Sequence, residues 1–455
     1  MPTPQQALPA RWRWQPLDSL SRVKVSTVDK KSYPDEVPVR LCNYTDVYYQ
    51  DVITSDLAFM EATASAEQIS RFSVQAGDVP ITKDSETSDD IGRPSYVPKD
   101  LPGVVYGYHL AIYRSFDPHY SKFIRYLFDS SLVRAELETR TPGVTRVGLS
   151  QDTLRNLRVP TPPPPVAAKI ADYLDHETAE IDAAIADQEK FMKLLNERRQ
   201  SLTWSSISGA DQPSNRVETG DDFWRAIPDD WTLQKLGWNF KIGNGSTPST
   251  STPRFWSDSG FPWVNSSVVN HALVIEPVRQ VTDAALQELH LPIVPSGSLL
   301  VGITGQGKTR GTVTKLGITT TINQHVAYMT PLNERIVTTD YTRAALTASY
   351  PQLRHISDGN GGTKGALTCE MLQQFKIPIP PRDVQDQTVE TLSSQSKRIS
   401  SALDDASAVI DLARERRAAL ITAAVTGQID VTAKNKPAAE QIEDDIAQGL
   451  HREYA

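Results

Sequence analysis

The sequence has few of the features that mark secreted, membrane-embedded or metal-binding proteins. Only two cysteines occur in 455 residues, Cys42 and Cys369, and neither stands in a CxxC or CxH spacing, so neither a disulfide framework nor a zinc site is predicted. No apolar run reaches the roughly 18 residues that cross a bilayer. The amino-terminal residues lack the basic and apolar segments of a secretory signal. We therefore expect a protein of the cytoplasm.

Catalytic motifs are also scarce. The histidines are scattered, HExxH does not occur, and no Ser/His/Asp or Cys/His set stands out. The string GITGQGKT from Gly302 matches the phosphate-binding pattern GxxxxGK[ST], which needs a strand before it and a helix after it. SLLV supplies the strand, but the following RGTVTKLGITTTI is rich in glycine and β-branched residues. A glycine-rich β-hairpin is favoured, and a P-loop NTP-binding enzyme stays open as an alternative.

The charge of the chain is unevenly distributed. With 47 basic and 55 acidic side chains the net charge is -8, which at first sight disfavours binding to nucleic acid. Residues 161–215 carry 5 basic and 9 acidic side chains, whereas residues 235–364 carry 11 basic and 7 acidic ones. The second stretch therefore has a local balance of +4 and could face a polyanion.

An internal repeat organises the chain. LSQDTLRNLRVPTPPPPV from Leu149 aligns with LTCEMLQQFKIPIPPRDV from Leu367, and at the same offset of 367 − 149 = 218 Gly209 meets Gly427. Near the start of each half the motif Pro-x-x-Trp recurs at an offset of 219, from Pro9 to Trp12 and from Pro228 to Trp231. The sequence thus predicts two tandem halves. Residues 18–140 and 237–358 show no convincing alignment, which indicates two dissimilar inserts in two similar frames.

The end of each half is predicted to be a long helix that follows a proline-rich run, over residues 166–207 and 384–425. Each would be about 60 Å long. Both segments place apolar residues at heptad spacing, in the same phase. The predicted contact residues are Leu174, Ile181, Leu195, Leu202, Leu392, Ile399, Val409 and Leu420. We expect the two helices to pair with each other, although each could instead be the amphipathic edge of its own domain.

The inserts combine short β-branched or aromatic runs with clusters of Gly, Pro, Asn and Asp, as α+β domains do. The expected fold is therefore α+β: a pseudo-two-fold repeat of two mixed α/β domains separated by an antiparallel coiled coil. Residues 209–222 read as a polar linker, and residues 431–455 as a flexible tail.

Four strings now give the chain a family resemblance. They are GSTPSTSTPRFW and GFPWVNSS near the start of the second half, IPIPPRDVQ before its helix, and RERRAALITAAVTGQID at its end. Together with the two-half layout they resemble the DNA specificity subunit of Type I restriction-modification enzymes. The resemblance implies two target recognition domains that each read one half of a split DNA site. The implied divisions are 1–160 and 223–378 for these domains, 161–208 and 379–430 for the spacer helices, 209–222 for the linker and 431–455 for the tail.

The resemblance also implies the partners. A specificity subunit has no catalytic activity and no cofactor or metal of its own. It binds double-stranded DNA, modification subunits that methylate adenine with S-adenosylmethionine, and restriction subunits that use ATP and Mg²⁺. No membrane is involved. A coiled-coil adaptor that binds only protein remains an alternative, because the helical segments are acidic.

Candidate DNA contacts follow from charge and turn context and not from a family motif. Basic side chains can hold phosphates, and short polar ones can read base edges. The candidates are Lys83, Arg93, Lys99, Ser246, Thr247, Arg254, Asn265, Lys308, Arg310 and Lys364. The segment that contains Arg254 and Asn265 also contains Trp256 and Trp263. It could equally be a pair of turns whose two half-buried tryptophans pack a small domain.

Overall fold

The computed structural model describes residues 8–87, 90–140, 147–358 and 365–431. The chain forms two compact units. Unit 1 comprises Met1–Glu189 and Ser407–Ala455, and unit 2 comprises Lys190–Ala406. The part of unit 1 that precedes its long helix is called the first head (residues 8–161), and the corresponding part of unit 2 the second head (residues 216–379).

The two predicted long helices are present. α6 spans Pro164–Ser208 and α12 spans Arg382–Thr426, with 45 residues each. They begin 382 − 164 = 218 and end 426 − 208 = 218 residues apart, the offset of the sequence repeat. Pro164 stands at the first position of α6, where a missing backbone N–H costs no helical hydrogen bond.

Both helices end in the same way. Gly209 and Gly427 follow them with φ of +65° and +72°, the left-handed conformation that glycine adopts most readily. In each case the next N–H reaches back five residues: Ala210 donates to the Ser205 carbonyl at 2.8 Å and Gln428 to the Ala423 carbonyl at 2.8 Å. These are Schellman caps, which satisfy carbonyls that the helix end would otherwise leave unpaired.

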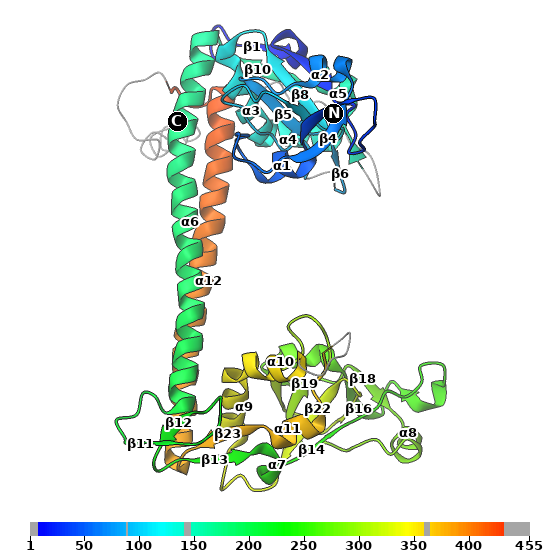
Figure 1. The fold of residues 1–455 in the computed structure, drawn as a ribbon, viewed down its shortest axis with the longest axis vertical. Coiled ribbons are helices and arrows are strands. Elements are labelled where there is room, and N and C mark those ends of the chain that lie inside the picture. The colour runs from blue at the N-terminus through cyan, green and yellow to red at the C-terminus, as the bar shows by residue number, and fades with distance from the viewer. Residues whose placement is uncertain (1–7, 88–89, 141–146, 359–364, 432–455) are drawn as a thin grey trace, which may run out of the picture. The chain divides into compact units, whose positions relative to one another are not determined.

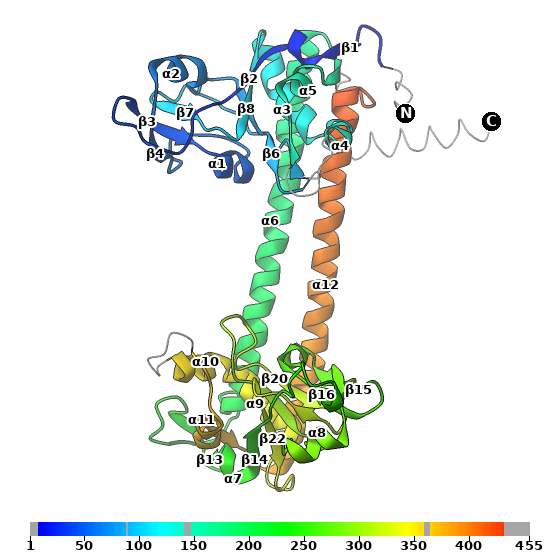
Figure 2. The ribbon, with the colours of Figure 1, turned by 90° about the vertical axis from the view of Figure 1, so that its right-hand side faces the viewer.

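Within each unit the two helices run antiparallel and lie side by side (Figures 1 and 2). In unit 1, Arg417 Nε of α12 lies 2.9 Å from Asp182 Oδ1 of α6, and three residues earlier Arg414 Nη2 lies 3.3 Å from Glu189 Oε1. In unit 2, the end of α6 and the start of α12 enter one apolar cluster, with Ile207 buried and Leu392 at its margin. The predicted antiparallel pairing is therefore confirmed.

The buried line of each helix differs in one respect from the heptad that we predicted. Leu174, Ile399 and Leu420 are buried. Ile181, Leu195, Leu202 and Leu392 are half-buried. Val409, however, is 50% exposed, and its neighbour Ile410 is buried instead. At this one position of α12 the buried residue therefore comes one place later than predicted. The sequence does not distinguish the two, because these helices also carry exposed apolar residues.

The described part of unit 1 contains two three-stranded sheets and two further strand pairs, with short helices around them. The strand orders are β2-β8-β5, β4-β3-β7, β1-β10 and β6-β9. The strands are β1 (Arg13–Pro16), β2 (Ser21–Val25), β3 (Val37–Cys42), β4 (Met60–Ala64), β5 (Asp78–Thr82), β6 (Asp84–Ser85), β7 (Val104–Tyr106), β8 (Leu110–Ser115), β9 (Val147–Gly148) and β10 (Arg158–Thr161). The helices are α1 (Tyr44–Tyr49), α2 (Ala66–Phe72), α3 (Ser121–Asp129), α4 (Ser131–Thr139) and α5 (Gln151–Arg155).

Unit 2 contains a five-stranded sheet, β14-β22-β19-β20-β17, a four-stranded sheet, β15-β18-β16-β21, and the pairs β11-β12 and β13-β23. The strands are β11 (Arg216–Glu218), β12 (Ala226–Pro228), β13 (Thr232–Lys235), β14 (Phe240–Asn244), β15 (Trp256–Ser257), β16 (Phe261–Val264), β17 (Leu273–Val274), β18 (Arg279–Val281), β19 (Leu299–Gly302), β20 (Val313–Leu316), β21 (Thr321–Ile322), β22 (Val326–Pro331) and β23 (Lys376–Ile379). The helices are α7 (Leu236–Asn239), α8 (Asp283–Glu288), α9 (Thr339–Ala348), α10 (Tyr350–Asp358) and α11 (Cys369–Gln374).

The frames of the two heads are built alike. β1 pairs antiparallel with β10 and β13 with β23, and both pairs lead into a long helix. The inserts share more than their sequences show, since the order β2-β8-β5 in unit 1 recurs as β14-β22-β19 in unit 2. The mixed α/β composition expected of the inserts is confirmed.

Across the described ranges, no helix combines the length and apolar character needed to span a membrane. The same residues contain no cluster of His, Cys, Asp or Glu with the geometry of a metal site. Cys42 is buried in the first head, and burial raises the pKa of its thiol.

Candidate nucleic-acid interface

In the first head, polar and aromatic side chains gather where β5 ends and β8 begins. Lys83 Nζ lies 2.7 Å from Asp84 Oδ2 and 4.9 Å from the centre of the Tyr108 ring. The same carboxylate oxygen of Asp84 lies 2.8 Å from Nδ1 of His109. Lys83 itself is largely buried, whereas the Tyr108 ring is exposed. The ammonium group of Lys83 is therefore paired within the protein, with Asp84. The exposed surface at this place is formed by Tyr108 and His109.

A recess of about 100 Å³ adjoins this group. It is lined by Asp29, Lys30, Asn43, Tyr44, Gly107, Tyr108 and His109. Position 107 has little room for a side chain, because a Cβ there would lie 3.2 Å from both Asn43 Oδ1 and the Cys42 carbonyl oxygen. The recess offers acidic, basic, amide and aromatic groups within one small area, a mixture suited to reading base edges.

The other two first-head candidates differ in their surroundings. Arg93 Nε lies 3.0 Å from Asp90 Oδ1, and its guanidinium stands over the ring of Tyr48, 5.8 Å from the ring centre. The Tyr48 hydroxyl donates to the same aspartate. Lys99 is exposed in the loop before β7, and no ion pair of its ammonium group is found among the described residues.

In the second head, a polar chain runs across the surface near the predicted Ser246 and Thr247. The Thr247 hydroxyl donates to Gln324 Oε1 at 2.7 Å, and the Gln324 amide nitrogen lies 3.3 Å from His325 Nε2. His325 Nδ1 in turn lies 3.0 Å from the Thr304 hydroxyl. Ser246 takes part through its backbone carbonyl, which accepts from the Trp263 indole at 3.4 Å.

Arg254 and Asn265 have local structural partners. Arg254 forms a two-pronged ion pair with Glu288, with N–O distances of 2.6 and 2.7 Å. The Asn265 side chain accepts from the Ser267 N–H at 2.9 Å and caps a short 3-10 helix. The nearby Trp263 is buried and meets the half-buried Trp256 edge to face at 5.3 Å. The packing interpretation of the tryptophans therefore holds for this segment.

The GITGQGKT string forms a β-hairpin. β19 and β20 pair antiparallel on either side of it, and no helix follows. Carbonyls of the loop are taken up by α10: Arg354 donates to Gly307 at 2.8 Å and to Gln306 at 3.2 Å, and the Tyr350 hydroxyl donates to Lys308 at 3.1 Å. The expectation of a hairpin is confirmed, and the loop lacks the helix N-terminus that a P-loop presents to phosphates.

The two basic residues of this hairpin have different environments. Lys308 is exposed at the loop, whereas Arg310 is only 2% exposed and forms an ion pair with Asp358. A Cβ at Gly365 would overlap the Arg310 guanidinium, so the cation is enclosed by neighbouring backbone. Lys364, the last candidate, lies outside the described residues.

Sequence reasoning missed the residues that the structure brings to the centre of each group, namely Tyr108, His109, Gln324 and His325. A signal was present in the strings YHLA and QHVA, whose last two residues begin the strands β8 and β22 of the two heads. This similarity is not apparent in a sequence comparison, because the segments around the two strings differ in length.

The described residues thus form two heads in tandem. Each head carries a surface group of aromatic and polar side chains, and each is joined to a long helix of an antiparallel pair. Residues 228–405 match the family described as Type I restriction modification DNA specificity domain.

Relatives agree with this match. The chain is 24% identical over 162 residues to the EcoR124I/EcoR124II specificity subunit of Escherichia coli, a segment that covers 35% of this chain and 39% of that protein. It is 19% identical over 396 residues to the putative MjaX specificity subunit of Methanocaldococcus jannaschii, which covers 85% of this chain and 87% of the relative.

Solved structures share the fold. A chain from a structure of the type I restriction-modification system aligns with a TM-score of 0.66 at 17% identity, over 93% of this chain and 100% of that one. The HsdS subunit from Thermoanaerobacter tengcongensis aligns with a TM-score of 0.54 at 16% identity, over 94% and 100%. Residues 228–405 thus match the specificity domain of Type I restriction-modification enzymes, and the chain as a whole is similar in sequence and fold to their specificity subunits.

Proposed function

We propose that this chain is the non-catalytic, DNA-reading subunit of a Type I restriction-modification complex in the cytoplasm, and that each head recognises one half of a bipartite target. The observation that carries the proposal is the duplicated frame: the same strand pair and long helix occur twice, while the surfaces at the strand ends differ. Two copies of one framework that carry different surfaces are suited to recognise two different DNA sequences. Residues 1–160 and 223–378 are the proposed target recognition domains.

The DNA contacts that we propose follow from which side chains are available. Lys99 and Lys308 are exposed and suit phosphate contacts, whereas Thr247 and Arg93 border the exposed polar groups. Lys83, Ser246 and Asn265 support those surfaces through the contacts described above. Arg254 and Arg310 are engaged by carboxylates, so we propose that they stabilise the second head and contribute little to DNA affinity.

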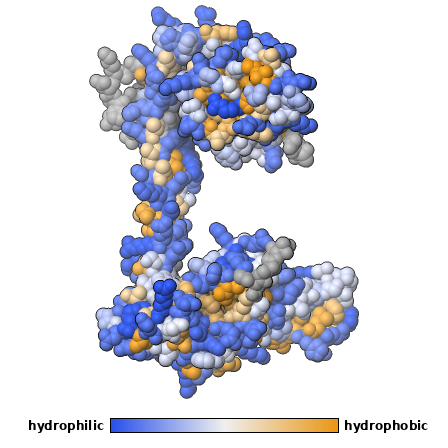
Figure 3. Space-filling view, viewed as in Figure 1, coloured by the Kyte–Doolittle hydropathy of each residue, from blue (hydrophilic) through white to orange (hydrophobic). Residues whose placement is uncertain are grey.

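The proposed partners are modification subunits, which would bring S-adenosylmethionine, and restriction subunits, which would bring ATP and Mg²⁺. A repeated apolar feature supports docking on the long helices. Their surface is predominantly hydrophilic (Figure 3), yet Phe191 and Leu194 are exposed on α6, and Val409 and Leu412 are exposed on α12. The second pair follows the first at the repeat offset, since 409 − 191 and 412 − 194 both equal 218. Two equivalent apolar patches suit two copies of one partner.

The first experiment is to express the chain with a methyltransferase subunit and to map methylated adenines by sequencing. We expect a split motif with a fixed gap, because each head reads one block. Exchanging residues 1–160 for those of another specificity subunit should change one block and leave the other intact. Absence of any motif would favour the protein-only adaptor, and a change in both blocks would contradict one head per block.

The docking patches give a separate prediction. Replacing Leu194 and Leu412 together by serine should weaken association with the modification subunit at least tenfold, because apolar side chains at the centre of an interface carry much of its energy. Both leucines are exposed, so the thermal stability of the free chain should stay near that of the wild type.

The matched control changes a polar pair at the same offset, Glu197→Gln with Glu415→Gln, and should leave association intact. Association measured by co-purification and by light scattering distinguishes these outcomes. Full binding by the serine variant would place docking on another surface.

A further inference from the structure

The turns before the central strands of the two heads occupy equivalent positions. β8 and β22 are the middle strands of the corresponding orders β2-β8-β5 and β14-β22-β19. Ala111 of β8 faces Ile81, just as Ala327 of β22 faces Val301. One step before each strand, the carbonyl of His109 accepts from the Lys83 N–H at 3.0 Å, and the carbonyl of His325 accepts from the Ile303 N–H at 3.1 Å. The register therefore makes His109 and His325 structural equivalents, although the inserts cannot be aligned by sequence.

The imidazole rings are also held alike. In each head the side chain that contacts Nδ1 belongs to the residue two positions after the end of the neighbouring strand. In the first head this residue is Asp84, because β5 ends at Thr82, and in the second head it is Thr304, because β19 ends at Gly302. The Nδ1 distances are 2.8 Å to Asp84 Oδ2 and 3.0 Å to Thr304 Oγ1. Both rings keep access to solvent, with the His109 side chain 44% exposed and His325 exposed.

The equivalence extends into the loops that follow β5 and β19. Gly92 donates its N–H to the Thr82 carbonyl at 2.9 Å, and Gly311 donates to the Gly302 carbonyl at 2.8 Å. Both glycines have positive φ, +77° and +86°. One backbone arrangement thus surrounds each histidine. The neighbouring exposed residue differs, being Tyr108 in the first head and Gln324 in the second.

The two heads are proposed to recognise different DNA sequences. A residue that is identical in both heads is therefore suited to contact the phosphate backbone, which all DNA shares. A residue that differs between the heads is suited to contact bases. Resting on the proposed function, we propose that His109 and His325 are equivalent phosphate contacts, one in each head, and that Tyr108 and Gln324 beside them face bases. Phosphate contacts fix register and orientation on the duplex, and contacts with base edges carry the specificity.

The hydrogen-bonding capacity of the rings fits this role. The Asp84 carboxylate only accepts, so Nδ1–H of His109 donates to it, and Nε2 can donate a second hydrogen bond only in the imidazolium form of the ring. A phosphate oxygen stabilises that charged form. Lys83 and the recess residues Asp29 and Lys30 are the other charged groups close to this ring. In the second head the Thr304 hydroxyl can donate or accept, so Nδ1 of His325 is satisfied in either ring form. Nε2 of His325 lies 3.3 Å from the Gln324 amide nitrogen, so the Gln324 side chain has to turn away before Nε2 can donate to a phosphate.

The test uses the complete chain assembled with its modification subunit and a duplex that carries the motif found by methylation mapping. His109→Ala and His325→Ala should each weaken binding about tenfold, the effect of one charge-assisted hydrogen bond. Each should also reduce the slope of log affinity against log salt by about 0.9. The double variant should lose about a hundredfold. The methylated motif should stay unchanged in all three.

His176→Ala, an exposed histidine on α6, is the matched control and should alter neither affinity nor salt slope. Tyr108→Ala and Gln324→Ala should each relax the motif in one block only. Wild-type affinity and salt slope in both histidine variants, with the motif retained, would overturn the inference while leaving the proposed function intact. A motif changed by His109→Ala would also overturn it, because the histidine would then read a base. Failure to obtain any motif contradicts the proposed function itself.

Discussion

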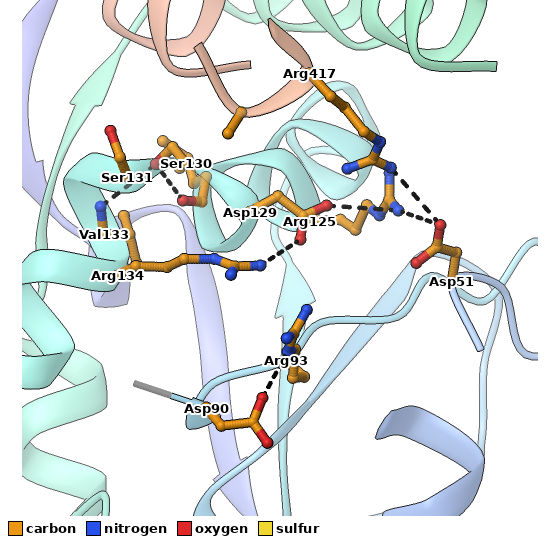
Figure 4. Close-up of polar contacts among 12 residues, drawn as sticks. Asp51, Asp90, Arg93, Arg125, Asp129, Ser130, Ser131, Val133, Arg134 and Arg417 are labelled. Atoms are coloured by element: carbon orange, nitrogen blue, oxygen red, sulfur yellow. Dashed lines mark hydrogen bonds and ion pairs between the residues drawn. The ribbon is translucent and has the colours of Figure 1, made fainter. Parts of the chain in front are cut away.

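Replacing Arg125 by alanine is expected to cost unit 1 about 3 to 5 kcal/mol of unfolding free energy, because it leaves a buried carboxylate short of its cation. Arg125 lies on α3 with its side chain 9% exposed, and it contacts Asp51 at 3.1 Å and Asp129 at 3.5 Å (Figure 4). Asp129 is 10% exposed, and its other ion-pair partner is Arg134 at 3.6 Å. Arg417 of α12 also reaches Asp51, at 3.8 Å, so the same network connects the head to the long helix.

The effect should depend on pH with a defined sign. Burial raises the pKa of Asp129, and the guanidinium groups of Arg125, Arg417 and Arg134 oppose this. A carboxyl group whose folded pKa is raised favours folding most when it is protonated, and that contribution is lost as pH rises through the folded pKa. Removing Arg125 raises this pKa further. The cost of Arg125→Ala should therefore be largest at neutral pH and shrink as the pH falls toward about 4, the ordinary pKa of aspartate.

The measurement is hydrogen exchange in α3 and α4, which reports on unit 1 separately from unit 2. Arg71→Ala is the control, because Arg71 is 58% exposed and pairs with Glu67 along α2; it should cost less than about 0.5 kcal/mol. Changing Asp129 to Asn in the Arg125→Ala background should recover part of the loss. Equal effects of Arg125→Ala and Arg71→Ala would show that the network is solvated and contributes little.

Gly427→Ala is expected to destabilise unit 1 by about 2 to 4 kcal/mol, the sum of a left-handed backbone penalty and overpacking. Its φ is +72°, and a Cβ there would lie 2.5 Å from Pro9 Cγ and 3.2 Å from the Trp12 ring. Gly209 meets Pro228 and Trp231 at the same two distances. Each helix end therefore packs on a Pro-x-x-Trp motif, and in unit 1 this contact joins the end of the described chain to its beginning.

The matched control is Gly103→Ala, also in unit 1, with φ of +76° and no atom within 4 Å of an added Cβ. It should cost about 1 kcal/mol, the backbone term alone. Denaturant unfolding of the three proteins separates the two contributions. If Gly427→Ala and Gly103→Ala cost the same, Pro9 yields to the methyl group and the close packing contributes nothing.

The long helices and the two-half layout were predictable because they depend on local rules. A proline run, an uninterrupted helical segment and a glycine at its end fix where α6 and α12 begin and end to within about two residues. The prediction of the contact line was less accurate at Val409. Apolar residues occur both in the contact between the two helices and on their exposed faces. Only the packing of the helices shows that Ile410 is buried and Val409 is exposed.

The candidate interface was predicted less completely. Charge and turn context drew attention to the loops, but Arg310 and Arg254 form ion pairs with carboxylates that lie 48 and 34 residues away in the sequence. The histidine turns were missed because loops of different length separate the strands. Equivalence at those turns is a property of sheet register, which hydrogen bonds between distant strands define.

The sequence by itself determined that this chain is a tandem repeat, that each half ends in a long helix, and which family it resembles, because motifs and helical periodicity are written in contiguous residues. Only the tertiary structure decided that the dissimilar inserts share the strand orders β2-β8-β5 and β14-β22-β19, and which polar side chains meet at their ends. The physical reason is that backbone hydrogen bonding specifies strand order with little regard to side-chain identity, so two inserts can keep one topology while their sequences diverge.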